Sequence, residues 1–108
     1  MSTRLRYAVV VAALLMTTTG SFAQDAQRLR ARSLAATCAQ CHGTDGRAPD
    51  ATAVPGLAGM PATYLVEQMN AFKSGARAGS VMPQLAKGFS DAQIGELAAW
   101  FAQVPKTR

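Results

Sequence analysis

The clearest pattern of apolar and polar positions lies near the carboxyl end of the chain. Ser90 and Gln93 have the spacing of a capping box, and Phe89 with Ile94 has the spacing of a hydrophobic staple, so a helix is expected to begin here. Pro105 marks its end. Beyond the cap, apolar residues recur at i, i+3, i+4 and i+7, the spacing of one helix face: Ile94, Leu97, Ala98 and Phe101.

A second apolar stripe, at i, i+4 and i+7, consists of Leu65, Met69 and Phe72. Pro61 suits the first position of this helix and Gly75 stops it. A third helix is predicted from Asp25 to about Thr37, because the segment is rich in alanine.

The remaining segments, residues 43–60 and 75–88, are rich in glycine and proline and are predicted to be mostly loop, with at most a short turn in the second. No segment alternates with period two, so the predicted fold is all-α, a few helices in one domain.

The first residues have the pattern of a cleavable secretory signal. Arg4 and Arg6 form a basic start, Tyr7–Met16 is apolar, and Ser21-Phe22-Ala23 is a small-x-small cleavage site. We therefore expect residues 1–23 to be removed and residues 24–108 to form the domain. Ten apolar residues are few for a bilayer span, which needs about 20. The alternative is an uncleaved membrane anchor.

An exported, periplasmic location follows from that signal, and no other apolar run is long enough for stable membrane insertion after its removal. The full chain has a formal charge of +5; without Arg4 and Arg6, nine Lys and Arg face six Asp and Glu, a mild balance of +3. The basic residues are scattered, and no nucleic-acid-reading element is recognisable, so nucleic-acid binding is not expected.

The strongest chemical pattern is Cys38-Ala39-Gln40-Cys41-His42, the arrangement of a c-type haem attachment site. Each thiol can form a thioether to one porphyrin vinyl group, and the adjacent imidazole can bind the iron. A zinc half-site is the first alternative, but two Cys and one His are too few for a structural site of about four ligands. A thioredoxin-like redox pair is the second, and the βαβ context it requires is missing.

The second iron ligand has to be something other than histidine, because His42 is the only one. Met82 is the favoured candidate, in the predicted loop before the last helix, with Pro83 stiffening an extended backbone. Met60 stands at a helix start, and Met69 is on an apolar stripe where a core role is expected. An open or lysine-ligated iron is the alternative.

Two further residues are candidates for supporting the haem. A ligating histidine normally donates its other N–H to a carbonyl, and the Pro55 carbonyl is our candidate. Arg77 has the guanidinium geometry that suits a haem propionate, and the alternative is an ordinary surface arginine.

These motifs, in order, resemble a class I cytochrome c: CAQCHGTDG, the Pro55-x-Leu57-x-Gly59 segment, the Met82 region and SDAQIGELAAWFA. Tyr64-Leu65, Gln68, Phe72, Gly75 and Arg77 are similar to the cytochrome c4 and flavocytochrome c branch. FKSGARAGSVMPQLAKGFSDAQ resembles the cytochrome subunits of flavocytochrome c sulfide dehydrogenases. The resemblance implies one covalent haem c on Cys38 and Cys41, with His42 and Met82 as axial ligands and Pro55 as the partner of His42.

The implied function is single-electron transfer from a flavoprotein dehydrogenase subunit that oxidises sulfide to a downstream redox acceptor. The chain itself is expected to be a non-catalytic subunit, since it has no GxGxxG motif and no further cysteines. A free soluble carrier that serves other dehydrogenases is one alternative. A haem enzyme with an open iron site is another.

Overall fold

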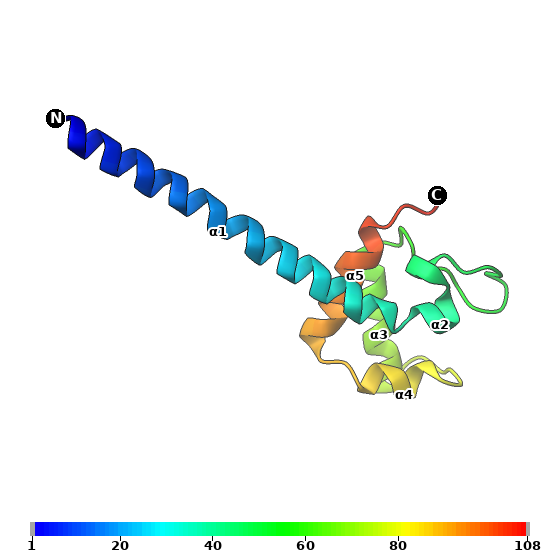
Figure 1. Ribbon diagram of the computed structural model, residues 1–108. Helices are drawn as coiled ribbons and strands as arrows, with labels where there is room; N and C mark the ends of the chain where they lie inside the picture. The colour runs from blue at the N-terminus through cyan, green and yellow to red at the C-terminus, as the bar shows by residue number, and fades with distance from the viewer. Residues whose placement is uncertain (1, 108) are drawn as a thin grey trace. The chain divides into compact units, whose positions relative to one another are not determined.

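The computed structural model describes residues 2–107, except for the side chains of residues 13–19. Throughout this range the chain is helical or irregular and contains no strand, which confirms the all-α prediction (Figure 1). The elements are α1 (Thr3–Ala36), α2 (Ala39–His42), the 3₁₀ helix η1 (Thr44–Gly46), α3 (Ala62–Ser74), α4 (Met82–Lys87) and α5 (Asp91–Gln103).

The chain divides into two units, of which the first ends at Arg30 and the second begins at Ala31. The first unit contains most of α1, up to Arg30, with exposed apolar side chains such as Tyr7, Val10 and Phe22. The expected signal, residues 1–23, includes residues 13–19, whose side chains lie outside the described ones. No helix in the described part of the chain combines the length and apolar character needed to cross a membrane.

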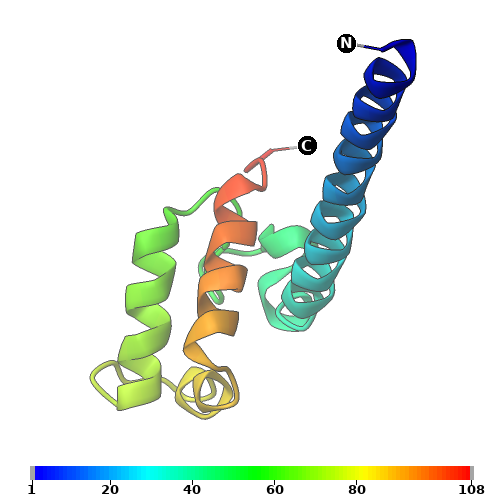
Figure 2. The same cartoon turned by 90° about the vertical axis from the view of Figure 1, so that its left-hand side faces the viewer.

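The second unit has its core where α5, α3 and the last turns of α1 meet. Figure 2 shows α3 and α5 side by side, and both α4 and α5 contact α3. The central cluster consists of Ala35, Leu65, Leu97, Ala98 and Phe101. Only Leu65, Ile94, Leu97 and Phe101 are large among the buried hydrophobic residues described, the others being alanines, so the polypeptide core is small.

The last helix agrees with its prediction. The Gln93 backbone N–H donates to Ser90 Oγ (3.2 Å), and the Ser90 backbone N–H donates to Gln93 Oε1 (2.9 Å), so the capping box is complete. All four residues of the predicted stripe are buried, and Phe101 is 3% exposed. The pattern therefore located both the start of α5 and its core face.

The second predicted helix needs one correction at its start. Pro61 has an extended ψ of 133° and caps α3 from outside, whereas the first helical residue is Ala62. The end at Gly75 is confirmed, with φ at 84°. Leu65 is buried while Met69 and Phe72 are half-buried, so the stripe faces the core at its amino-terminal end.

The segment before α5 is the main correction. Residues 75–88 were expected to be mostly loop, but Met82 opens the short helix α4 and Pro83 lies in its first turn. Proline is tolerated there because the first N–H groups of a helix have no partner and its φ is already helical. Six residues are too few to show a period, and the completely buried Ala86 is what anchors them.

Loss of the α5 cap is expected to destabilise the domain. Ser90→Ala leaves the Gln93 N–H without its partner and should lower the free energy of unfolding by about 1 kcal/mol. Denaturant unfolding followed by circular dichroism measures this value. Ser80→Ala, at an exposed serine outside the helices, is the matched control and should change it little. Equal effects in the two variants would contradict the role of the cap.

Candidate functional site

The Cys38–His42 segment forms a single helical turn. The His42 backbone N–H donates to the Cys38 carbonyl (3.0 Å), and the Cys38 N–H in turn donates to Ala35 O at the end of α1 (3.1 Å). Both cysteines are free thiols, Cys38 half-buried and Cys41 exposed. His42 is 9% exposed. The turn therefore presents two thiols and an imidazole within five residues.

The two thiols differ in their surroundings. Burial raises the pKa of the Cys38 thiol, and the Thr37 hydroxyl, 3.9 Å from its sulfur, opposes that rise only in part. Cys38 is consequently a neutral thiol at neutral pH.

The imidazole of His42 is held by the partner that the sequence predicted. His42 Nδ1 lies 2.7 Å from the backbone oxygen of Pro55. Because a carbonyl can only accept, Nδ1 carries the proton and donates it. The lone pair is therefore on Nε2, the arrangement of a histidine that binds a metal through Nε2.

The loop that carries Pro55 is fixed by Gly46. The Gly46 carbonyl accepts from Leu57 N (2.7 Å) and from Ala58 N (3.1 Å). Its φ is 72°, and a Cβ there would stand 2.9 Å from both Leu57 Cβ and the Phe101 ring. Only glycine combines this backbone conformation with such close packing. Gly46 belongs to the CAQCHGTDG motif of the sequence, but its contact with Phe101 is visible only in the tertiary structure.

The carboxyl-terminal end of the chain closes over the same loop. Gly59 N donates to the Phe101 carbonyl (2.8 Å), and Arg47 Nε donates to the Pro105 carbonyl (2.8 Å). Arg47 also pairs with Asp45 at 3.3 Å. The loop is thus attached to α5 and to the residues after it. The position of Arg47 in the sequence gave no indication of this attachment.

A tight turn at Asp50 starts the approach to Pro55. Asp50 Oδ1 accepts from the Thr52 hydroxyl (2.5 Å) and from Thr52 N (2.9 Å). These bonds, with the hydroxyl contributing most, hold the pKa of the Asp50 carboxyl below its ordinary value. The turn is exposed, so it shapes the loop through local hydrogen bonds rather than through burial.

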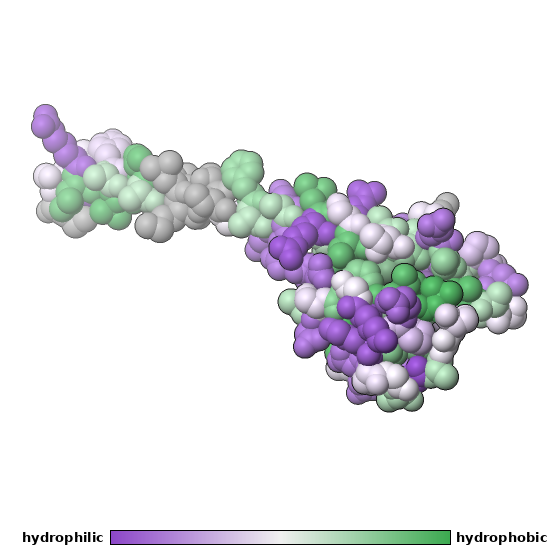
Figure 3. Space-filling model, turned by 90° about the horizontal axis from the view of Figure 1, so that it is seen from below, coloured by the Kyte–Doolittle hydropathy of each residue, from purple (hydrophilic) through white to green (hydrophobic). Residues whose placement is uncertain are grey.

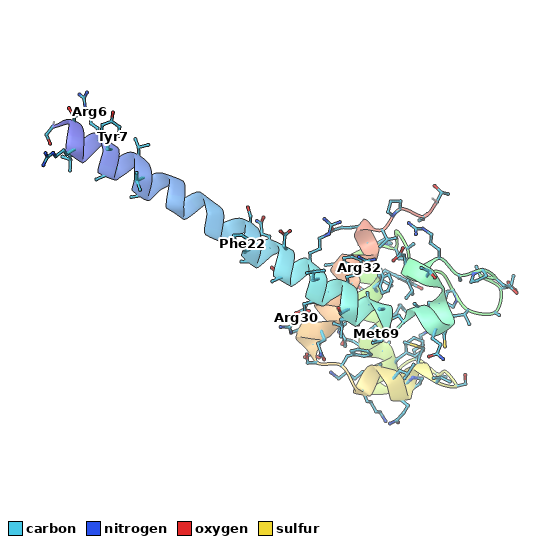
Figure 4. The ribbon with its side chains drawn as sticks, viewed as in Figure 1. Arg6, Tyr7, Phe22, Arg30, Arg32 and Met69 are labelled. Carbon is cyan, nitrogen blue, oxygen red and sulfur yellow. The ribbon has the colours of Figure 1, made fainter. Side chains whose placement is uncertain are left out.

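The three methionines of the domain lie in different settings. Met82 is the first residue of α4 and is half-buried, and Met60 packs against the core cluster. Met69 lies on α3 (Figure 4). Within the described residues, no three His, Cys, Asp or Glu side chains gather as a metal site.

Arg77 lies in a contact that the sequence did not indicate. Its guanidinium stacks over the Phe72 ring, 4.6 Å from the centroid, and donates to Gln68 Oε1. The propionate role remains a prediction, and the structure adds a partner for Arg77 on α3.

Apolar side chains stay exposed around α4. Val81 is 54% exposed and Leu85 47%, and Tyr64 on α3 is 42% exposed. Figure 3, which views the molecule from below Figure 1, shows apolar surface among the polar side chains on that face of the domain. Large apolar side chains therefore remain on the surface at α4 and on α3.

Comparison with known proteins gives the family. The sequence profile of the family described as "Cytochrome C oxidase, cbb3-type, subunit III" matches residues 25–101. The chain therefore belongs to this family of cytochrome c electron-transfer domains, and its cofactor is covalent haem c.

Several relatives are named for the electron transfer that they serve. The cytochrome subunit of sulfide dehydrogenase from Chlorobaculum tepidum is 33% identical over 93 residues, 82% of this chain and 83% of that protein. A thiosulfate dehydrogenase electron acceptor from Thiomonas intermedia is 41% identical over 70 residues, 65% of this chain and 32% of that protein. A second, from Stutzerimonas stutzeri, is 36% identical over 99 residues, 88% of this chain and 45% of that protein. The chain therefore spans a third to just under half of the thiosulfate-linked relatives.

The residues of the Cys38–His42 turn fit haem c. Two free thiols in the CxxCH spacing supply the thioether sulfurs, and His42 has its Nε2 lone pair free of the Pro55 bond. The small polypeptide core also fits a domain whose interior includes a porphyrin.

Substitution of Gly46 is expected to disrupt this loop. Gly46→Ala adds a Cβ against Phe101 at a positive φ, so we expect a loss of about 2–5 kcal/mol in the free energy of unfolding. Denaturant unfolding of the holoprotein, followed by circular dichroism and haem absorbance, measures it.

The matched control is Gly95→Ala on α5. Gly95 is exposed, with no atom within 4 Å of its would-be Cβ, so alanine should stabilise the helix by about 1 kcal/mol. Changes of the same sign and size in the two variants would contradict the packing argument for Gly46.

Proposed function

We propose that this chain is a periplasmic monohaem cytochrome c that accepts electrons one at a time from a sulfide-oxidising flavoprotein and passes them to a downstream acceptor. The observation that carries the proposal is the hydrogen bond from His42 Nδ1 to the Pro55 carbonyl, next to the two free thiols. A histidine held in this way is prepared to bind iron through Nε2.

The attachment roles go to the residues of α2 and the residue before it. The S–H group of Cys38 would add across one porphyrin vinyl group and that of Cys41 across the other, so that the two sulfurs hold the haem as thioethers. His42 would bind the iron through Nε2, and the Pro55 carbonyl increases the basicity of its ring by accepting a hydrogen bond from Nδ1–H.

The distal ligand in this proposal is Met82. Its position at the first residue of α4 places its side chain on a rigid element rather than on a free loop. Met60 and Met69 are less suited: Met60 packs on the core cluster, and Met69 belongs to the predicted stripe of α3. Thioether ligation raises the reduction potential, which suits an electron acceptor.

When bound, haem c supplies a single-electron Fe(III)/Fe(II) couple. Oxidation of sulfide to zero-valent sulfur releases two electrons, so two cycles of reduction and reoxidation balance one turnover of the flavoprotein. The chain has no flavin-binding fingerprint of its own. The oxidation step therefore belongs to the partner in this proposal.

The choice of sulfide rests on length rather than on identity, which is 33% for the sulfide-linked relative and 41% and 36% for the two thiosulfate-linked ones. The sulfide dehydrogenase cytochrome subunit of Chlorobaculum tepidum is matched over 83% of its length, so it corresponds to this chain almost from end to end. The two thiosulfate dehydrogenase electron acceptors are matched over 32% and 45% of theirs. Their names nevertheless favour a second candidate, a carrier that receives electrons from a thiosulfate-oxidising dehydrogenase.

Export is part of the proposal. Residues 1–23 act as a cleavable signal and residues 24–108 remain as the haem domain, so haem attachment takes place outside the cytoplasm. In an oxidising compartment, the free thiols of Cys38 and Cys41 would otherwise form a disulfide.

Replacement of Met82 tests the distal ligand. Ferric native holoprotein should show the weak long-wavelength methionine-to-iron absorption band, and Met82→Ala should lose it completely and become high-spin. Met69→Leu, which changes a half-buried methionine of α3, is the control and should keep the band. A band that persists in Met82→Ala would remove Met82 from the site.

The donor is tested with the purified holoprotein and a flavoprotein sulfide dehydrogenase. Sulfide should reduce the haem rapidly only when the flavoprotein is present, and the two proteins should co-elute from native extract. Reduction that instead requires a thiosulfate dehydrogenase and thiosulfate would favour the second candidate. If this chain instead elutes from native extract without the flavoprotein, that would indicate a diffusing carrier.

A further inference from the structure

The segment between α3 and α4 folds back on the end of α3. Gly75 N donates to the Phe72 carbonyl (3.3 Å) and Arg77 N donates to the Ala71 carbonyl (3.0 Å). These two backbone bonds reverse the chain direction immediately after α3. The residues that follow lead directly to Met82.

The side chain of Arg77 closes this reversal over α3. Its guanidinium lies 4.6 Å from the centroid of the Phe72 ring and donates to Gln68 Oε1. A guanidinium over an aromatic face is attracted by the ring quadrupole, and its planar fork can stack and donate at the same time. Arg77 thus contacts two residues on one face of α3, one turn apart.

The same Phe72 ring reaches the start of α4. A Cβ placed on Gly79 would stand 3.1 Å from Phe72 Cε1 and 3.2 Å from Pro83 Cδ, so the Gly79 backbone lies close to both side chains. Pro83 is the neighbour of Met82 and lies in the first turn of α4. A continuous set of contacts therefore runs from Arg77 through Phe72 and Gly79 to Pro83.

We propose that Arg77 is a positioning residue for the distal ligand: by clasping Phe72 and Gln68, it fixes the 75–81 segment and so holds Met82 in place for the haem iron. This inference rests on the proposed ligand role of Met82. It assigns the guanidinium to α3 rather than to a propionate, because its stacking and its hydrogen bond are both made there.

Loss of the clasp, that is, of the Arg77 contacts with Phe72 and Gln68, should change the affinity of the ferric haem for imidazole. Exogenous imidazole competes with the methionine sulfur for ferric iron, so its apparent affinity rises when the population with Met82 in place falls. Loss of a cation–π contact together with a hydrogen bond corresponds to about a tenfold change in such an equilibrium.

The experiment is an imidazole titration of ferric holoprotein at neutral pH, followed by the methionine-to-iron band. Arg77→Ala should bind imidazole about tenfold more tightly than the native protein. Arg77→Lys retains the charge but lacks the planar fork, so it should also bind more tightly. It serves as the second variant if Arg77→Ala does not fold.

Arg28→Ala is the control. It removes the same charge at an exposed position of α1, outside both ligand segments of the sequence. Its imidazole affinity should stay near the native value. Phe72→Leu removes the ring face on which Arg77 stacks but leaves the bond to Gln68, so adding Arg77→Ala to it should produce a smaller further change than in the native protein.

Three outcomes separate the two proposals. The clasp is supported if the native holoprotein shows the methionine-to-iron band and only the Arg77 variants bind imidazole more tightly. If the native protein shows the band but the Arg77 variants bind imidazole no more tightly, or Arg28→Ala binds it equally more tightly, the clasp is overturned and Met82 remains as ligand. Native holoprotein without the band overturns the ligand role of Met82, and the clasp with it.

Discussion

The hydrogen bond between His42 Nδ1 and the Pro55 carbonyl, 2.7 Å long, is the contact on which the site depends. It joins two residues 13 positions apart and determines which ring nitrogen carries the proton. An irregular loop would not hold a carbonyl at that point unaided. The Gly46 carbonyl therefore anchors Leu57 and Ala58, and the Phe101 ring packs against Gly46 itself. The tautomer of the imidazole thus follows from the packing of α5.

Because the core is small, hydrogen bonds from side chains to backbone carbonyls hold several segments of the domain in place. Only four large side chains are among the buried hydrophobic residues described, so long segments are held by individual bonds instead. Arg47 fastens the loop after α2 to Pro105, and Lys73 Nζ fastens the end of α3 to Phe89 O (2.7 Å) and Asp91 (3.1 Å). Each such hydrogen bond contributes about 1 kcal/mol net to the stability of the fold. These bonds therefore fix the position of the segments as much as they stabilise them.

Membership of the cytochrome c family and the relatives' names bear on different levels of function. The profile match over residues 25–101 and the CxxCH turn concern the cofactor and the class of electron transfer. The choice between sulfide and thiosulfate concerns a partner surface, and relatives with both names are similar to this chain. One haem domain can serve either donor, because the chemistry at the iron is the same and the substrate is bound elsewhere. In the proposed function, the surface around the haem rather than the residues that hold it would therefore distinguish one partner from the other.

The sequence by itself determined the local features: the α5 capping box, its buried stripe, the end of α3 at Gly75 and the CxxCH turn. Each of these is encoded within a few neighbouring residues by hydrogen-bonding and periodicity. The need of a ligating histidine for a carbonyl and the resemblance to class I cytochromes c made the Pro55 carbonyl a candidate, and it lies 2.7 Å from His42 Nδ1. Only the tertiary structure decided that Met82 begins a helix, that Gly46 packs on Phe101, and that Arg77 contacts Gln68 and Phe72. The physical reason is that α4 is too short for a period and is held by the burial of Ala86, while the contacts of Gly46 and Arg77 depend on how separate turns and loops pack.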